Sequence, residues 1–397
     1  MMSMSELNTN METNKEQLYM ELYKKQSKLA WYASERASAT LHKAWEKCYA
    51  LALMAAPLPE CEANINELFY ARDKRIKRIF PESVNIAYAC SEQFAPFCGV
   101  SVFSLIANSD KCKNYDILIM HAGNLSELNK KHLCALAAGK PNISIRIINC
   151  AQAYIVKECR LRSYFSAEVY FRCLLMTEFF AEYDRFVYLD SDTIINTDIS
   201  ALYNRNISGK SIAAVSDLCM QYLVNSGANL VLNGTLLSYK YYISRFLSLD
   251  NSSQYFNSGV MLMDTGKIRT EGLCSKVFAM LQSGDYYCFE QCVLNKVFKN
   301  SVERISQIWN VQDITNVYGN CNDHISENTL SHLKWCIPRY KIMHYIGPDK
   351  PWYKPDAESS RVFTAYAYGT VWFRTIIYAS LADRAEEFLQ HYHGRPG

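Results

Sequence analysis

Two carboxylates follow a short apolar run in the middle of the chain, in Phe186-Val-Tyr-Leu-Asp190-Ser-Asp192. The four apolar residues are typical of a buried strand, and open α/β sheets bind ligands at the carboxyl ends of their strands. Two hard oxygen ligands at such a place suit Mg²⁺ or Mn²⁺, which would neutralise a departing diphosphate. Taken alone, the pattern also fits a turn with two solvated acids.

A second group of candidate residues lies near the C-terminus, in Lys341-Ile-Met-His344-Tyr-Ile-Gly347-Pro-Asp-Lys350-Pro-Trp352. A neutral imidazole is a good third ligand for a transition metal, so His344 favours Mn²⁺ over Mg²⁺. Gly347 allows a phosphate to approach the backbone closely, and Lys350 supplies a positive charge for the departing oxygens. The alternative is that His344 is a structural residue at the end of a strand.

The elements that position these residues read as an α/β sheet. Short apolar runs alternate with helical stretches, which predicts a largely parallel sheet covered by helices. The runs are Val84–Cys90, Asp116–Met120, Ile143–Ile148, Phe186–Leu189 and Ile212–Val215. We expect a helix over Ala167–Tyr183, with Ser166 as its cap.

The two flanks have a different composition. Residues 15–54 and 62–79 are expected to be helices. The second helix contains the basic run 73–78, which fits either a solvated helix face or a surface that contacts anionic lipid or a partner. Aromatic residues 366–378 fit either a membrane surface that holds the acceptor or a helix that completes the core. The expected division is a helical N-terminal extension (1–82), a catalytic domain (83–353) and a C-terminal aromatic tail with helices (354–397).

Charge and cysteine content exclude some classes. The net charge of +3 is too small to favour a nucleic-acid partner, and fifteen cysteines without a CxxC pair favour free thiols in a reducing cytoplasm. No stretch reaches the ~20 apolar residues that a membrane span needs. We therefore expect a cytoplasmic protein, with any membrane contact made from the surface.

Five elements together resemble glycosyltransferase family 8, most closely its bacterial lipopolysaccharide galactosyl- and glucosyltransferases. They are the strand Ile86–Glu92, the pair Asp190/Asp192, the strand Tyr255–Val260, the helix start Glu290–Asn295 and the element His344–Trp352. The resemblance covers about Val84–Tyr353 in the family's order. It implies the GT-A fold, a Rossmann-like, mostly parallel sheet, with UDP-galactose or UDP-glucose as donor and Mn²⁺, or else Mg²⁺, as cofactor.

The resemblance also implies roles for single residues. The metal ligands would be Asp190, Asp192 and His344, and the catalytic residues would be Asp217, Glu290 and Gln291. Substrate contacts would come from Ala89, Cys90, Ser91, Arg172, Asp190, Ser191, Asp192, Asn257, Gly347 and Lys350. Two positions depart from the family: Ser91 stands where an acid is common, which leaves Glu92 as an alternative uracil contact, and Glu290 stands where Asp is common.

The implied reaction retains the configuration of the sugar. Retention requires either a covalent intermediate or attack by the acceptor on the same face, and we favour the second because Gln291 is a poor nucleophile. Glu290 and Asp217 would be better ones. The acceptor would be a saccharide or a lipid-linked sugar. Alternatives are a glycogenin-like protein that glucosylates itself, a non-catalytic sugar-binding protein, and a phosphatase of the haloacid-dehalogenase type, whose strand-DxDxT pattern also fits Phe186–Ile195.

Overall fold

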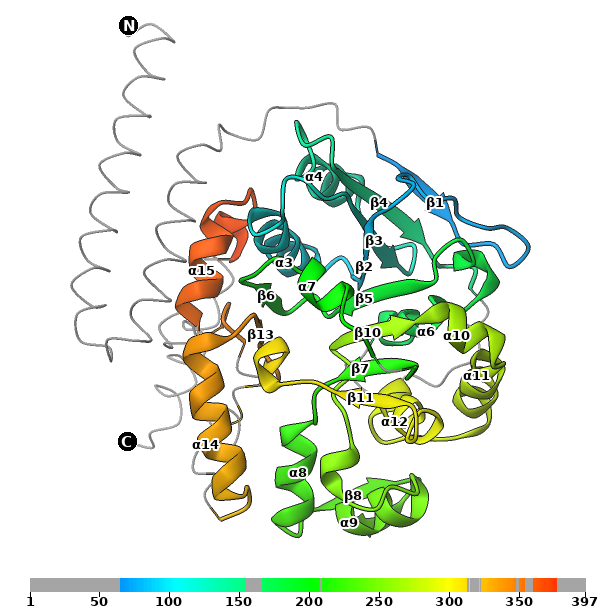
Figure 1. Cartoon of the computed structure of the whole chain (residues 1–397), viewed down its shortest axis with the longest axis vertical. Coiled ribbons are helices and arrows are strands. Elements are labelled where there is room, and N and C mark those ends of the chain that lie inside the picture. Colours follow the sequence, from blue (N-terminus) through cyan, green and yellow to red (C-terminus); the bar gives the residue numbers. More distant parts are fainter. Residues whose placement is uncertain are drawn as a thin grey trace, which may run out of the picture.

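A computed structural model of the chain describes residues 65–153, 166–207, 209–312, 314, 321, 323–347, 350–353 and 360–376. These residues form an eight-stranded sheet in the order β1-β4-β3-β2-β5-β10-β7-β11 (Figure 1). Within it β10 alone runs antiparallel to its neighbours β5 and β7, so the prediction of a mostly parallel sheet is confirmed. The bounds are β1 Glu67–Phe69, β4 Ile143–Asn149, β3 Tyr115–His121, β2 Val84–Ala89, β5 Arg185–Leu189, β10 Val260–Asp264, β7 Ile212–Ala214 and β11 Val302–Arg304.

Two smaller sheets join it. β12 (Val311–Gln312), β13 (Ile342–His344) and β6 (Thr193–Ile195) form one, and β8 (Asn229–Leu232) and β9 (Thr235–Ser238) form a hairpin. The main α-helices are α3 Ala95–Ala107, α4 Glu127–Ala135, α8 Leu218–Asn225, α11 Leu273–Ser283, α12 Phe289–Val297, α14 Glu327–Cys336 and α15 Ser360–Tyr368. Shorter α-helical segments are α6 Phe171–Leu174, α7 Ser200–Tyr203, α9 Tyr239–Tyr241 and α10 Thr265–Thr270. The 3₁₀ turns are η1 Ala167–Tyr170, η2 Glu178–Phe180, η4 Ser252–Gln254, η5 Gln307–Trp309 and η6 Ile337–Arg339, and η3 Tyr242–Phe246 is a π-helix.

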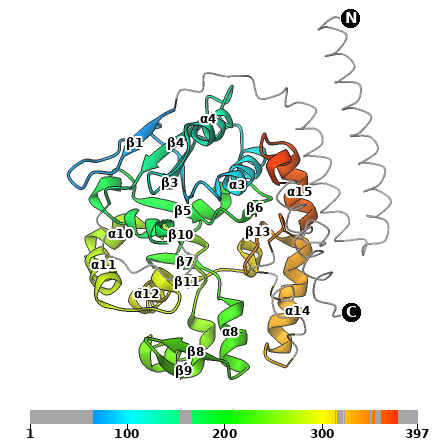
Figure 2. The same ribbon diagram turned by 180° about the vertical axis from the view of Figure 1, so that it is seen from behind.

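The main sheet has a hydrophobic core on each face. Side chains of a strand alternate between faces, so in β3 Ile117 and Ile119 enter one core while Leu118 and Met120 enter the other. Helices α3, α4 and α15 cover the first face, and α6, α10, α11 and α12 cover the second (Figures 1 and 2). Burial on both faces explains why these strands are continuous apolar runs in the sequence.

Three predicted elements are wrong in detail. The expected helix over Ala167–Tyr183 is broken into η1, α6 and η2, and the side chain of Ser166 caps none of them. Tyr255–Gly259 is a connection, and the strand begins only at Val260. In place of the helix expected to end near residue 79, the described residues contain β1 and a loop, so the sheet begins before residue 83.

The C-terminal aromatic segment packs on α3. Tyr366 and Trp372 are buried, and the Trp372 indole covers Gly99, where any Cβ would clash with the ring. Trp372 Nε1 also donates to Asn129 Oδ1 at 2.8 Å. As far as Ile376, the segment therefore completes the core, the second of the two alternatives; residues 377–397 and the predicted helix over 15–54 lie outside the described residues.

Candidate active site and metal centre

Strand pairing brings Asp190, Asp192 and His344 together. Asp190 follows β5, Asp192 immediately precedes β6, and β6 pairs antiparallel with β13 so that Thr193 lies opposite His344. One ligand atom from each of the three side chains lies within 4.8 Å of the others. His344 Nε2 is 3.3 Å from Asp192 Oδ1 and 3.8 Å from Asp190 Oδ2. This is a three-ligand cluster of two oxygens and one nitrogen, as the residue types predict.

Gly259 makes room for this cluster. A Cβ there would lie 2.7 Å from Asp190 Oδ2 and closer still to His344 Cε1. The Gly259 carbonyl also accepts the Asp190 N–H at 2.7 Å, which fixes the backbone of the first carboxylate. The residues present therefore fit a divalent cation, because they supply an N,O donor set whose atoms lie within 4.8 Å of one another.

A chain of buried amides determines which nitrogen of His344 faces the carboxylates. The Asp217 carboxylate accepts from Asn257 Nδ2 at 3.0 Å, so Asn257 Oδ1 faces Asn310 Nδ2 at 2.9 Å. Asn310 Oδ1 then lies 3.0 Å from His344 Nδ1 and must accept from it. A neutral His344 consequently carries its proton on Nδ1 and directs the Nε2 lone pair at the cluster, the state that a metal ligand needs.

Lys350 pairs with the second carboxylate. Its Nζ lies 2.6 Å from Asp192 Oδ2 and 2.6 Å from the Tyr345 carbonyl oxygen. Burial opposes ionisation of Asp192, but the positive charge of Lys350, joined by that of His344 when the imidazole is protonated, outweighs it and holds the pKa of that carboxyl well below its usual range. Gly347 has φ of 76°, a conformation that glycine adopts readily, and it turns the chain between His344 and Lys350.

Arg172 joins the metal cluster to the predicted sugar site. Its Nη2 donates to Asp190 Oδ1 at 2.8 Å, and its Nη1 donates to Ser258 Oγ and to the Ser258 carbonyl oxygen. Its Nε lies 3.3 Å from Glu290 Oε1. The guanidinium is buried and lies 4.4 Å from the centroid of the Tyr188 ring, so Arg172 does not form an ion pair on a helix surface.

Gln291 and Asp217 are held by partners on both sides. Gln291 Oε1 accepts from the Ser258 N–H at 2.8 Å, and its Nε2 donates to Asp217 Oδ2 at 3.1 Å and to Tyr255 Oη at 3.2 Å. Asp217 Oδ1 accepts the Met220 N–H at 2.8 Å and so caps α8. Sequence reasoning missed this capping role.

Glu290 lies buried in the first turn of α12. Its place at the start of a helix predicts an ionised carboxylate, because the positive end of the helix dipole stabilises negative charge. Burial outweighs that effect and the attraction of Arg172, and it raises the pKa of Glu290 to about 7. The carboxyl therefore exchanges a proton near neutral pH.

The predicted nucleotide strand ends beside the same cluster. Ser191 Oγ donates to the Ala89 carbonyl oxygen at 2.8 Å, which ties the carboxyl end of β2 to the acidic turn. Cys90 is buried, and Ser91 is half-buried. Glu92 is directed elsewhere, because its two oxygens accept from the Ser126 N–H and from Asn129 Nδ2. Both oxygens of Glu92 therefore accept hydrogen bonds from the start of α4.

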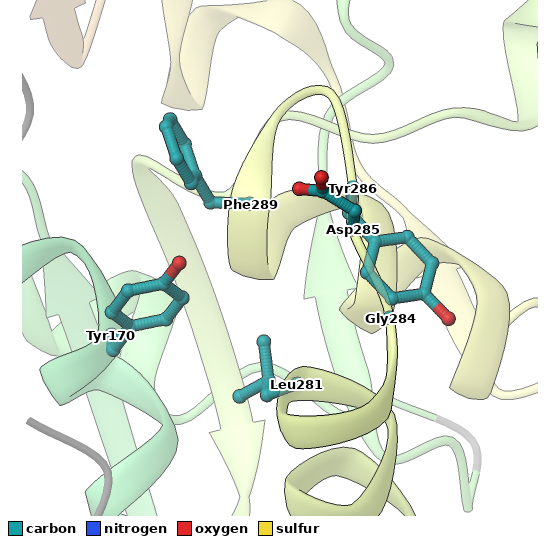
Figure 3. Close-up of a pocket in the computed structure, with 6 residues that line it drawn as sticks. All are labelled: Tyr170, Leu281, Gly284, Asp285, Tyr286 and Phe289. Carbon is teal, nitrogen blue, oxygen red and sulfur yellow. The ribbon is translucent and has the colours of Figure 1, made fainter. Parts of the chain in front are cut away.

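A shallow pocket lies next to the predicted sugar site. Figure 3 shows Tyr170 and Phe289 on one side and Asp285 and Tyr286 on the other, with Leu281 and Gly284 completing the lining. Phe289 adopts φ of 45°, which is uncommon for a residue with a side chain. It directly precedes Glu290, so the pocket and the site share the start of α12.

The structure brings the predicted metal ligands and the residues Arg172, Asp217, Asn257, Glu290, Gln291 and Lys350 into one hydrogen-bonded region. Sequence reasoning missed Asn310, Ser258, Tyr188 and Tyr255 as partners within it. Asn310 stands alone between η5 and β12, and no motif marked it. The other three lie inside quoted motifs, where only their neighbours were chosen.

Comparisons with known proteins identify the family of the chain. The sequence profile of Glycosyl transferase family 8 matches residues 85–355. A putative glycosyltransferase of Haemophilus influenzae is 26% identical over 69% of this chain and 74% of its own length. The lipopolysaccharide 1,2-glucosyltransferase of Escherichia coli is 24% identical over 69% of this chain and 74% of its own. The lipopolysaccharide 1,3-galactosyltransferase of Salmonella typhimurium is 25% identical over 68% of this chain and 74% of its own length.

Solved structures share the fold. The bifunctional glycosyltransferase WbbM matches with a TM-score of 0.70 and 26% identity over 77% of this chain, which spans 53% of that protein. An active-site mutant of LgtC matches with a TM-score of 0.53 and 20% identity over 72% of this chain and 96% of its own. The fold is thus GT-A, as the resemblance implied, and the phosphatase alternative is excluded. The family profile matches well over half of the length of this chain. The chain therefore belongs to glycosyltransferase family 8.

Proposed function

We propose that the chain transfers a hexose, galactose or glucose, from a UDP-sugar to a saccharide or lipid-linked acceptor. One observation carries the proposal: Asp190, Asp192, His344 and Lys350 converge at the carboxyl end of β5, where this fold class binds its ligands. The names of two relatives, a lipopolysaccharide glucosyltransferase and a lipopolysaccharide galactosyltransferase, support a hexose donor and a lipopolysaccharide-like acceptor.

Asp190, Asp192 and His344 would hold Mn²⁺, with Mg²⁺ as the alternative, because the set contains a nitrogen ligand. When bound, the ion supplies positive charge to the leaving diphosphate. Lys350 adds a second positive charge beside Asp192, and Gly347 leaves the neighbouring backbone accessible to a phosphate oxygen. Ala89, Cys90, Ser91 and Ser191 would border the uridine.

The donor sugar would lie against Arg172, Asp217, Asn257, Glu290 and Gln291. These side chains are fixed by one another before any donor binds, which is the preorganisation that transfer requires. Glu290 and Gln291 would recognise sugar hydroxyls. Their network combines charged groups with amides that both donate and accept hydrogen bonds, which suits a polyhydroxylated ring.

Retention by front-face attack is supported by the state of the two possible nucleophiles. Both oxygens of Asp217 accept hydrogen bonds, from the Met220 N–H on one side and from Asn257 and Gln291 on the other. Glu290 is paired with Arg172, and at neutral pH its raised pKa leaves part of it protonated. Hydrogen bonding of Asp217 and partial protonation of Glu290 both lower nucleophilicity, which favours the acceptor hydroxyl itself as the nucleophile.

Release of UDP from a panel of UDP-sugars, with Mn²⁺ present, tests the proposal. We expect turnover of UDP-galactose or UDP-glucose and retained anomeric configuration in the product, read by NMR. No UDP release from any donor would favour the non-catalytic sugar-binding alternative. Added hexoses on the chain itself, detected by mass spectrometry after incubation with UDP-glucose alone, would favour the glycogenin-like alternative.

The location remains a prediction. The part of the chain that the structure describes contains no helix long and apolar enough to cross a membrane. We propose a cytoplasmic protein that contacts a membrane peripherally if its acceptor is lipid-linked. Two aromatic residues of the C-terminal tail, Tyr366 and Trp372, are buried and so do not make that contact.

A further inference from the structure

A loop rich in positive charge follows the edge strand β1. We call residues 72–78 the basic loop; its cations are Arg72, Lys74, Arg75, Lys77 and Arg78, and its single acid is Asp73. All six of these residues are exposed, whereas Ile76 between them is buried. The cations therefore lie on both sides of Ile76 in the sequence, and its buried side chain holds the loop against the protein.

The backbone of the basic loop is fixed to the body of the protein. The Ile76 N–H donates to the Phe179 carbonyl oxygen at 2.8 Å. The Lys77 carbonyl oxygen accepts from Arg146 Nη1 at 2.8 Å and from Tyr183 Oη at 3.2 Å. Since these contacts hold the backbone and not the charged side chains, the loop presents its cations to solvent on an ordered frame.

Most of this charge has no acidic partner. Arg75 pairs with Glu178 at 3.1 Å, and both side chains are more than half exposed, at 61% and 64%. Arg78 donates to the carbonyl oxygens of Glu182 and Pro81, which carry no net charge. In the described ranges no acidic side chain forms an ion pair with Arg72, Lys74 or Lys77.

Two large apolar side chains flank the basic loop. Phe69, at the end of β1, is 64% exposed, and Ile79, just after the loop, is 49% exposed. Single exposed apolar residues are common on protein surfaces, but here they stand on both sides of a cationic run. Basic side chains with neighbouring aromatic and aliphatic ones are the combination that binds anionic bilayers, because the charges attract headgroups and the apolar groups enter the interface.

One end of this surface, Phe69, lies on the edge of the sheet that carries the active site, whereas Ile79 lies shortly before β2 and so toward the amino edge. Strands β1, β4, β3, β2 and β5 are all parallel, so Phe69 at the end of β1 lies on the same edge of the sheet as Asp190 after β5. In both views β1 is the outermost strand and the loop after it projects beyond the sheet (Figures 1 and 2). We propose that Phe69, the basic loop and Ile79 dock this part of the protein on an anionic lipid bilayer. A soluble polyanion would bind the cations of the basic loop, but Phe69 would not contribute to its affinity.

Sedimentation of the full chain with vesicles tests this docking. One variant combines Arg72→Gln, Lys74→Gln and Lys77→Gln, and another is Phe69→Ser. The matched control combines Lys240→Gln, Arg245→Gln and Lys334→Gln, three exposed cations on α9, η3 and α14. The probes are phosphatidylglycerol–phosphatidylcholine vesicles, pure phosphatidylcholine vesicles and heparin.

We expect the wild type and the control to bind the anionic vesicles. Each cation near an anionic surface contributes roughly fivefold, so the loss of three should weaken binding by the basic-loop variant about 100-fold. Phe69→Ser should weaken vesicle binding several-fold and leave heparin binding unchanged. Failure of the wild type to bind, equal binding by the basic-loop variant, or an equal loss in the control would overturn the proposal. Vesicle binding unaffected by Phe69→Ser, together with loss of heparin binding in the triple variant, would assign the surface to soluble polyanions instead. UDP release is measured separately on each variant, so failure of the docking and failure of the proposed reaction are distinguishable.

Discussion

The two halves of the site satisfy their polar groups in different ways. In the sugar half, Asn257, Gln291 and Asp217 each have protein partners for both ends of their polar groups. In the metal half, Asp190 Oδ2, Asp192 Oδ1 and His344 Nε2 face one another, and with neutral His344 no proton lies between them. Three electron-rich atoms at this separation are stabilised by a cation. The contacts of the sugar half thus hold its side chains in one geometry, and those of the metal half arrange its side chains to bind a positive charge.

The largest expected effect comes from removing charge in the metal half. Asp192→Asn keeps the size of the side chain but loses a ligand charge and the ion pair with Lys350. We expect turnover of the UDP-sugar to fall about 10²- to 10³-fold, by analogy with the loss of one electrostatic stabiliser. A rate within threefold of wild type in steady-state assays would reduce Asp192 to a turn residue.

A pH-dependent effect on stability is expected in the sugar half. Burial raises the pKa of Glu290 from the ordinary 4.5 to about 7, so between these values the folded protein holds a proton that the unfolded chain releases. The contribution of Glu290 to stability is therefore lost as pH rises through this window, by about 3 kcal/mol. Glu290→Gln does not titrate. We therefore expect the free energy of unfolding of the variant, measured in urea and relative to that of wild type, to be about 3 kcal/mol higher at pH 8 than at pH 4. If the difference between the two proteins were the same at both pH values, the pKa of Glu290 would be ordinary.

The link between the halves can be broken at Asn310. Asn310→Ala removes the acceptor that holds the His344 proton on Nδ1, and loss of such a partner typically weakens metal binding by about 10- to 100-fold. Gln312→Ala is a matched control, because that buried amide bonds the Leu218 N–H while its backbone pairs with His344. Calorimetry with Mn²⁺ should show the loss only for Asn310→Ala. Equal losses for both would mean general damage to β12.

The smallest expected effect is on donor recognition. Glu290→Gln keeps the shape of the side chain and removes its charge, so we expect a several-fold higher KM for the UDP-sugar and a modest loss of kcat. Gln291→Ala, which frees Asp217 and Ser258, should behave similarly. If Glu290→Gln bound donor normally by calorimetry but had no turnover, the carboxylate would be the covalent nucleophile and front-face attack would be wrong.

The sequence predicted the sheet and the metal half well because both depend on local patterns. Strands β2, β3, β4, β5 and β7 are buried on two faces, which forces unbroken apolar runs. Asp190 follows β5, Asp192 precedes β6 and His344 ends β13, so the predicted strands of β5 and β13 also located these side chains.

The remaining features depend on tertiary contacts that no local pattern reports. Residues 167–183 have a helical pattern, yet they break into short turns that place Arg172 between Asp190 and Glu290. Asn310 gains its role only because β12 lies beside β13. The Trp372 indole is buried because Gly99, far away in the sequence, leaves space for it.

The central claim is that the cluster of Asp190, Asp192 and His344 holds the cation on which transfer from a UDP-sugar depends. The most direct measurement is UDP release by the wild-type chain from its best donor, first in excess EDTA and then after Mn²⁺, Mg²⁺ or Ca²⁺ is restored. We predict no release above background in EDTA and recovery that is greatest with Mn²⁺. Full activity in excess EDTA would contradict the claim.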